Sequence, residues 1–448
     1  MKTTKNSNWA RIRKFFNDIH LWVGLISGLF VFVICLSGTI YVYNDEIRAA
    51  SLPHLHKVTP QPEKLRLEQL KAIVQAESQA NITSINIASD PTKSYQIFTK
   101  TEGEKSRFGT GYYIDPYTGN ILGTSKETNG TTEFMSSMFS LHRWLLLDKV
   151  EEPLIEGLEN RKLGSYISGG MTILFTIGLL TGMVIWFPRK IRAWRQGLTI
   201  KFSSNWKRIN HDLHNSLAFY SLFFLLIMGI TGPQWSFDWY RDGLRKTLGT
   251  YEAPKEKSAG AEGNQKAGGE GDRKARNEGD RKAGGEGGRK GADKAAEGDS
   301  APEPINLLSA DEYLAAANST FPYTGDVRMA LPSKADDPVK ISKYKAGFFA
   351  PAAADQASLN IQNASVEEVV IFRDKPFNER VSGSIKALHI GDVYGQFSKL
   401  LYFLTCLVAT TLPITGTLIW INKMKKKKKK KKSGRPVQRK PVVNHESI

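Results

Sequence analysis

Four long runs of the sequence contain no Asp, Glu, Lys or Arg, and they constrain the fold more than any other feature. They cover residues 19–44, 163–188, 213–237 and 400–422, and they are rich in Leu, Ile, Phe and Val. About 20 apolar residues cross a bilayer as a helix. A buried helix of a soluble protein is the competing interpretation, but Trp and Tyr flank the runs, as in the aromatic belts of membrane proteins. The sequence therefore predicts four transmembrane helices.

The positive charges predict the orientation of these helices. Residues 1–18 carry a net charge of +4, the loop 189–212 carries +6 and the tail 423–448 carries +11, whereas the whole chain carries +18. Lys and Arg collect on the cytoplasmic side of membrane proteins. We therefore expect both termini and the loop in the cytoplasm, and residues 45–162 and 238–399 on the opposite side. The basic tail is a topology signal that can touch anionic lipid, and it does not indicate nucleic-acid binding.

The two external regions have the pattern of small α+β modules. The first contains a helical period at 65–78, strand-like alternation at 82–88 and 94–99, and a turn between two strands within 111–123. The second repeats this order, and its expected elements are a helix at 307–318 and strands near 339–344, 358–362 and 367–372. Residues 260–300 contain no aromatic, Leu, Ile, Val or Met residue. Such a segment cannot bury enough apolar surface to fold, so we expect a disordered linker at 255–303.

An internal repeat relates the two halves of the chain. When residues 17–39 are aligned with residues 211–233, Asp18 matches Asp212, His20 matches His214 and Gly38 matches Gly232. The second and fourth runs end alike, in TGMVIW at 181–186 and TGTLIW at 415–420, and a Leu-His pair precedes each of them. The sequence therefore predicts a four-helix transmembrane bundle built from two parallel repeats, a known construction of membrane proteins.

The repeat singles out four of the eight histidines. His20 and His214 lie at the cytoplasmic ends of two predicted helices, whereas His142 and His389 precede the other two on the external side. Two pairs of imidazoles at two depths are the ligands expected for two haems. The competing interpretation is that these histidines are ordinary interfacial residues. His211, which lies one helical turn before His214, is a possible alternative ligand.

The cysteines limit the kinds of cofactor. The chain has two, Cys35 and Cys406, and both lie in apolar runs. This excludes a disulfide-built fold, a thiolate zinc site and a cysteine-ligated iron–sulfur cluster. No CxxCH motif is present, so any haem would be the non-covalent haem b.

In these features the sequence resembles the PepSY-associated transmembrane family of bacterial inner-membrane proteins. The resemblance rests on IHLWVGLISGLFVFVICLSGTIYVYNDEI (19–47), YYIDPYTGNILG (112–123), LHRW (141–144), DLHNSLAFY (212–220), LHIGDVYG (388–395) and the two TG-x-x-IW endings. It implies PepSY-like external modules on the periplasmic side of the inner membrane. Family members include ferric-siderophore reductases that carry haem in the membrane, so it also implies electron transfer to a periplasmic ferric chelate.

The resemblance assigns roles residue by residue. It implies that His20, His142, His214 and His389 are the axial haem ligands, and their depths pair His20 with His214 and His142 with His389. Arg143, beside His142, is a candidate partner of a haem propionate, although a surface or lipid-head role is equally expected. No GxGxxG motif opens a helix after a predicted strand, so the electron donor would be a separate cytoplasmic reductase or a membrane quinol.

Two other functions compete with the reductase. The external modules are also suited to bind a peptide or a partner protein, in which case the helices would only anchor them. A transporter or channel is disfavoured, because the four runs contain no charged side chain to mark an ion path.

Overall fold

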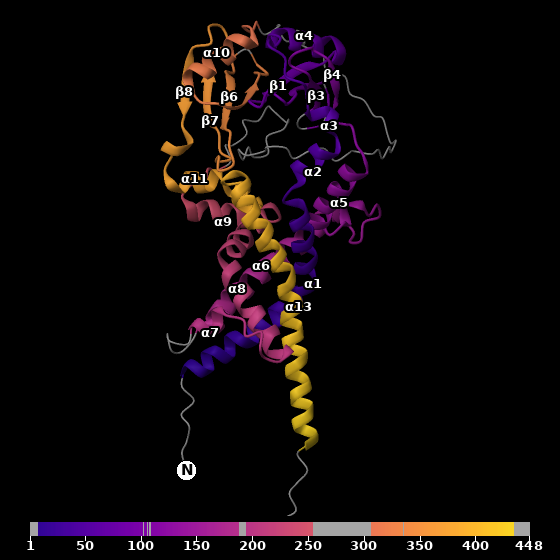
Figure 1. The fold of residues 1–448 in the computed structure, drawn as a ribbon, viewed down its shortest axis with the longest axis vertical. Helices are drawn as coiled ribbons and strands as arrows, with labels where there is room; N and C mark the ends of the chain where they lie inside the picture. The colour runs from indigo at the N-terminus through magenta and orange to yellow at the C-terminus, as the bar shows by residue number, and fades with distance from the viewer. Residues whose placement is uncertain are drawn as a thin grey trace, which may run out of the picture.

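The computed structural model describes residues 8–187, 194–253 and 306–433, apart from residues 102, 105, 107, 108 and 335. Four long helices form a bundle, and a β-sheet lies at one end of it (Figure 1). The predicted linker 255–303 and the tail beyond residue 433 lie outside the described residues. The start of the first helix and the end of the last both lie at the end of the bundle opposite the sheet (Figure 1).

The bundle consists of four helices that are long and apolar enough to cross a membrane. They are α1 (Asn8–Tyr41), α6 (Asn160–Trp186), α8 (Trp206–Thr231) and α13 (Gly395–Ser433). The helices extend beyond most ends of the charge-free runs, because a charge-free run marks only the part expected in hydrocarbon, whereas a helix continues into the polar head-group layer. The prediction of a membrane protein is confirmed.

Small and hydroxylated side chains allow the four helices to pack closely. α1 packs against α6 and α13, and α8 packs against the same two helices. Leu179, Leu225, Ala409 and Leu412 form the buried centre. Hydroxyl groups such as that of Thr410 donate to a carbonyl one turn earlier in their own helix, so they bring no unsatisfied polar atom into the bundle.

Most of the shorter helices lie where the bundle meets the sheet, whereas α7 (Trp194–Leu198) lies between α6 and α8 at the opposite end of the bundle (Figure 1). Two of them carry predicted site residues: α5 (Gly130–Trp144), which packs on α1 and α6, and α12 (Ile385–Ile390), which packs on α8. The others are α2 (Asn44–Ser51), α3 (Pro53–His56), η1 (Leu147–Lys149), η3 (Gly232–Trp235), α9 (Asp238–Leu248), η4 (Phe372–Asp374) and α11 (Phe377–Gly383).

The strands among the described residues form one antiparallel sheet of eight strands in the order β4-β3-β2-β1-β5-β6-β7-β8. The first region supplies β1 (Asn81–Ile87), β2 (Tyr95–Lys100), β3 (Thr110–Ile114) and β4 (Ile121–Thr124). The second region supplies β5 (Gly325–Ala330), β6 (Val339–Lys345), β7 (Asp355–Leu359) and β8 (Val366–Val370). The strand order is symmetric about the β1–β5 pair, so each region contributes one half of the sheet.

Two helices cover the sheet and cap each other at the seam between its halves. They are α4 (Leu67–Ser78) and α10 (Ala310–Thr320). The backbone N–H of Leu67 donates to Oδ1 of Asp311 over 2.8 Å, and the N–H of Ala310 donates to Oε2 of Glu68 over 3.0 Å. Each carboxylate satisfies an orphan amide at the other helix's N-terminus and lies at its positive end.

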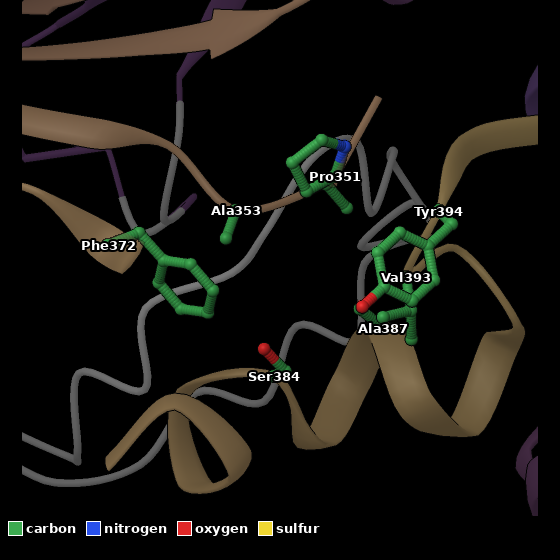
Figure 2. A pocket seen from close by; sticks show the side chains of 8 residues that line it. Pro351, Ala353, Phe372, Ser384, Ala387, Val393 and Tyr394 are labelled. Atoms are coloured by element: carbon green, nitrogen blue, oxygen red, sulfur yellow. The ribbon is translucent and has the colours of Figure 1, made fainter. Parts of the chain in front are cut away.

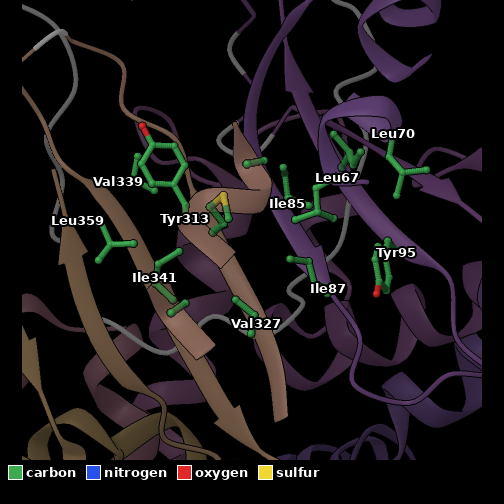
Figure 3. Close-up of a cluster of buried hydrophobic side chains, with 14 of the residues drawn as sticks. Leu67, Leu70, Ile85, Ile87, Tyr95, Tyr313, Val327, Val339, Ile341 and Leu359 are labelled. Atoms are coloured by element: carbon green, nitrogen blue, oxygen red, sulfur yellow. The ribbon is translucent and has the colours of Figure 1, made fainter. Parts of the chain in front are cut away.

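The two predicted modules therefore differ from the structure in one respect. The expectation was two small modules, but their strands join through β1 and β5 and share one hydrophobic core. This core runs across both halves, from Leu70 and Ile85 to Tyr313 and Leu359 (Figure 3). Either half of the sheet alone would leave β1 or β5 as an unpaired edge strand. Pairing β1 with β5 removes both of those edges.

Ile85 gives a direct test of the shared core. Its side chain is fully buried and it pairs with Met329 across the seam. Replacing Ile85 with alanine is expected to destabilise the sheet by about 2–5 kcal/mol. Hydrogen exchange of the sheet amides in the purified full chain measures this loss, which should extend into β5 and β6. Val369→Ala on the exposed edge strand β8 is the control, with an expected cost below about 0.5 kcal/mol. A loss confined to β1–β4 would contradict the shared core.

Candidate functional site

The structure brings the four predicted histidines together as two pairs. The ring centres of His20 and His214 lie 6.3 Å apart, and those of His142 and His389 also lie 6.3 Å apart. His20 comes from α1 and His214 from α8, whereas His142 comes from α5 and His389 from α12. The first half of the chain (α1 to α6) and the second half (α8 to α13) therefore contribute one ring to each pair.

The spacing within each pair fits a single metal ion between two imidazoles. A ligand nitrogen lies about 2 Å from a metal ion. The centre of an imidazole ring lies about 1 Å behind that nitrogen, so two rings on opposite sides of one iron have centres about 6 Å apart. The two pairs are well separated, because Gly38, the α1 residue that His142 touches, lies 18 positions after His20. This separation corresponds to about 27 Å along a helix.

In the pair nearer the start of α1, both rings use Nδ1 for hydrogen bonds within their own half. Nδ1 of His20 lies 2.9 Å from the carbonyl oxygen of Gly178 on α6, and a carbonyl can only accept, so Nδ1 donates. Nδ1 of His214 lies 2.8 Å from Oγ1 of Thr415 on α13. That hydroxyl donates to Thr411 O over 3.0 Å, so its oxygen accepts from His214. Nε2 is the nitrogen left for a metal in both rings.

The pair nearer the sheet is arranged in the same way. Nδ1 of His142 donates to the carbonyl oxygen of Ile34 on α1 over 2.8 Å. Nδ1 of His389 lies 3.0 Å from Oγ1 of Thr231, which donates its own proton to Ile227 O over 2.7 Å. All four rings are thus held as the tautomer that presents Nε2, as is usual for metal-bound histidine.

A glycine of the neighbouring helix lies against each ring. A Cβ added at Gly38 would lie 2.9 Å from Cε1 of His142, which is too close for a carbon–carbon contact. An added Cβ would lie 3.0 Å from His20 at Gly182, 3.3 Å from His214 at Gly416 and 3.4 Å from His389 at Gly232. Gly38, Gly182 and Gly416 therefore let three of the imidazoles lie directly on a helix backbone, whereas a Cβ at Gly232 would be in ordinary contact with His389.

Burial keeps the rings of the pair near the sheet neutral. Desolvation lowers the pKa of His142, and it lowers the pKa of His389 to about 3. Neutral imidazole is the form that binds a metal ion. Trp235 in η3 adds to this burial, because its ring centre lies 5.0 Å from that of His389.

Arg143 lies at the edge of the same pair. Its Nη2 donates to the carbonyl oxygen of Trp235 over 3.2 Å, and the described residues include no ion-pair partner for it. Burial, together with repulsion from Arg161, lowers the pKa of Arg143 to about 10, so it remains charged at pH 7. The guanidinium of Arg161 lies over the Trp144 ring, 4.0 Å from its centre. Two neighbouring arginines without a described carboxylate partner suit an anionic group such as a propionate.

His211, the alternative ligand, has other contacts. Its Nδ1 lies 3.6 Å from Asp212 Oδ1 and 3.3 Å from Nδ2 of Asn215, and its side chain is half exposed. The structure pairs His20 with His214, the repeat-matched residue, and gives His211 no ring contact among the described residues.

Outside the histidine pairs, the part of the chain that the structure describes has an open hollow of about 430 Å³ lined by Gln61, Glu63, Lys64 and Tyr117. No group of three or more His, Cys, Asp or Glu side chains converges in that part of the chain. A cavity of about 60 Å³ lies beside α12, between Pro351, Phe372, Ala387 and Tyr394 (Figure 2).

Sequence reasoning found the four histidines and missed the residues that hold them. The glycines were matched across the repeat without a role, and Thr231 and Thr415 were not singled out. The sequence feature that marks these residues is the adjacent Thr and Gly of the TG motifs. Thr415 accepts a hydrogen bond from His214, and Gly416 makes room for the same ring. Trp235 gave no signal beyond its place in an aromatic belt.

Comparison with known proteins agrees with the architecture. No curated protein matches the chain. A family profile described as the PepSY-associated TM region matches residues 18–423, which include all four long helices for most of their length, the sheet and both histidine pairs. The chain therefore belongs to the family of proteins with the PepSY-associated transmembrane region.

Proposed function

We propose that the two histidine pairs each hold one haem b and that the chain is a membrane reductase for a ferric chelate. The observation that carries this proposal is the equal spacing of the two pairs, 6.3 Å between ring centres, with Nδ1 of every ring engaged elsewhere. When bound, the haems would supply reversible one-electron chemistry at two depths of the bundle.

The residues around the rings support this proposal. Interfacial histidines without a ligand would not need to share one tautomer. Nor would three of them need a glycine at a position where an added Cβ would press on the ring. Hydrogen bonds to Nδ1 fix ring orientation and raise the basicity of Nε2, which strengthens metal binding. Arg143, charged and without a described carboxylate partner, is suited to a propionate of the haem near the sheet.

The position of the sheet supports a direction for the reaction. The basic segments 1–18, 189–212 and 423–448 favour a cytoplasmic location for their end of the bundle, and this supports the proposal that the sheet lies in the periplasm. In this arrangement a cytoplasmic reductase or a quinol supplies electrons, and the ferric chelate accepts them on the sheet side. Reduction releases iron from hard oxygen chelators, because Fe(II) has a lower charge and is softer than Fe(III).

Anaerobic reoxidation tests this function. The purified chain is reduced with limiting dithionite and mixed with a ferric siderophore or ferric citrate. We expect the reduced spectrum to return to the oxidised one while Fe(II) appears, trapped by a chromogenic Fe(II) chelator. The gallium(III) complex of the same siderophore has a similar charge and shape but is not reduced, so it is the control. A chain that contains haem but is reoxidised only by oxygen would contradict the reductase function. The alternative function, a membrane-anchored module that binds a peptide or a partner protein, would then remain.

The angle between the rings predicts a magnetic signature. The ring planes cross at 76° in the His20–His214 pair and at 58° in the His142–His389 pair. With an iron bound between the two rings of a pair, strongly crossed ring planes would bring two iron d orbitals close in energy, whereas parallel planes would separate them. Electron paramagnetic resonance of the oxidised protein is therefore expected to show highly anisotropic low-spin signals, with the larger anisotropy for the His20–His214 site. Two ordinary rhombic signals would contradict this ring geometry.

A further inference from the structure

The loop between β6 and β7 exposes two phenylalanines at the junction of the sheet and the bundle. Residues 346–354 contain no charged side chain. Phe348 is 55% exposed and Phe349 is 64% exposed. Exposed neighbouring aromatics are rare on a water-facing surface and usually mark contact with a partner or with lipid.

The loop is fixed to the first turn of the α13 membrane helix. The backbone N–H of Phe397 donates to Phe348 O over 3.5 Å, and the Phe349 and Phe397 ring centres lie 5.2 Å apart. A Cβ added at Gly395 would lie 2.7 Å from Phe348 O, so only glycine allows this approach. The N–H of Ala352 donates to Val393 O over 3.3 Å. These contacts hold the two phenylalanines in place beside the helix.

The exposed face of α13 continues directly into this loop. Phe397, Leu400, Leu404 and Leu407 are all between 41% and 49% exposed. They recur every three or four residues, so they lie on one face of the helix, the face that meets lipid in a membrane-spanning helix. Because Phe349 packs on Phe397, the loop extends this apolar face toward the sheet. Figure 1 shows that the ends of β6 and β7 that the loop joins lie close to the start of α13.

We propose that the β6–β7 loop is a second membrane contact, in which Phe348 and Phe349 insert into the lipid leaflet on the sheet side. The occupant of this apolar surface is lipid, because the surface is continuous with the lipid-facing stripe of α13 and carries no charge to select a protein partner. Phe and Leu side chains on an apolar face become buried at the boundary between head groups and acyl chains. The loop is also bonded to Val393, so its insertion holds the α12–α13 junction, and with it the second half of the sheet, at the membrane surface.

Site-directed labelling of the full chain tests this proposal without reference to haem. Phe348→Cys and Phe349→Cys are made separately in a Cys35→Ser/Cys406→Ala background and labelled with an environment-sensitive fluorophore in lipid nanodiscs. Val366→Cys is the matched control, because Val366 is 43% exposed and pairs with Leu359 at the end of β7 away from the loop. Size-exclusion profiles establish that each variant is folded. Phosphatidylcholine with spin-labelled acyl chains and aqueous iodide are the two quenchers.

The proposal predicts opposite quenching for labels in the loop and for the label at the control position 366. Labels at positions 348 and 349 should emit at shorter wavelength, lose most of their emission to the spin-labelled lipid and resist iodide, whereas the label at position 366 should be quenched by iodide alone. Labels at 348 and 349 that behave like the one at 366 would overturn the proposal. So would labels that are protected from both quenchers, because protection without lipid contact indicates a protein partner or a second copy of the chain.

Discussion

Replacing His142 with alanine is expected to remove about half of the haem from the purified chain and to leave the other half spectroscopically unchanged. The reason is the pairing of the rings: His142 lies opposite His389, whereas His20 lies opposite His214, about 27 Å away along α1 by the rise of a helix. Haem content per chain, measured by extraction and by the reduced spectrum, gives the result. The redox titration should change from two components to one.

His20→Ala should give the complementary result and retain the component that His142→Ala removes. His211→Ala is the matched control, because His211 neighbours His214 in sequence but contacts Asp212 and Asn215 instead. It should retain both components. If either His142→Ala or His20→Ala removed all haem from a chain with an unchanged size-exclusion profile, the two-site account would be contradicted in favour of a single shared site.

Enlarging Gly38 is expected to empty the same site without changing any ligand. A Cβ at this position already lies 2.9 Å from the His142 ring, so Gly38→Leu must push the ring away from its place opposite His389. Overpacking of this kind costs about 1–3 kcal/mol. Haem content and the redox titration should therefore resemble those of His142→Ala, and Gly38→Ala should have a weaker effect of the same kind.

Gly24→Leu is the control for this prediction. Gly24 lies on the same helix, and an added Cβ there meets nothing within 4 Å. The variant should keep both haems, since a leucine side chain at an open position of a membrane helix costs little. Full haem content in Gly38→Leu would contradict the role of the glycine in placing the ring.

The sequence predicts the bundle well because a membrane imposes a simple rule. A helix in hydrocarbon excludes charged side chains over about 20 residues, so charge-free runs mark the four helices. The ends of the helices are less predictable. α13 begins at Gly395, before the charge-free run at 400, and Lys399 in this added part of the helix forms an ion pair with Glu46.

The sheet is predicted less completely, because strand pairing depends on distant residues. β5 was not expected: its six residues include Asp326 and Arg328, so only Val327 and Met329 carry an apolar alternation. Its pairing with β1 decides that the two regions form one sheet, and no local pattern encodes this contact. The reciprocal caps of Glu68 and Asp311 are also invisible until α4 and α10 lie side by side.

The candidate site is also predictable from the sequence only in part. Repeat-matched positions and two depths are properties of the sequence, and they place His20 with His214 and His142 with His389, as the structure does. The contact of each ring with a glycine belongs to the tertiary structure. Gly38 and Gly182 come from different helices, and only the packing of α5 on α1, and of α1 on α6, brings the rings to them.

The visible spectrum of the purified chain tests the central claim most directly. The protein is expressed with ample haem, isolated in mild detergent and measured before and after dithionite, with haem and protein quantified in the same sample. Two bis-histidine sites predict a strong Soret band, sharp reduced α and β bands of a six-coordinate haem b, and a haem-to-chain ratio near two. A folded chain with no Soret band would contradict the account.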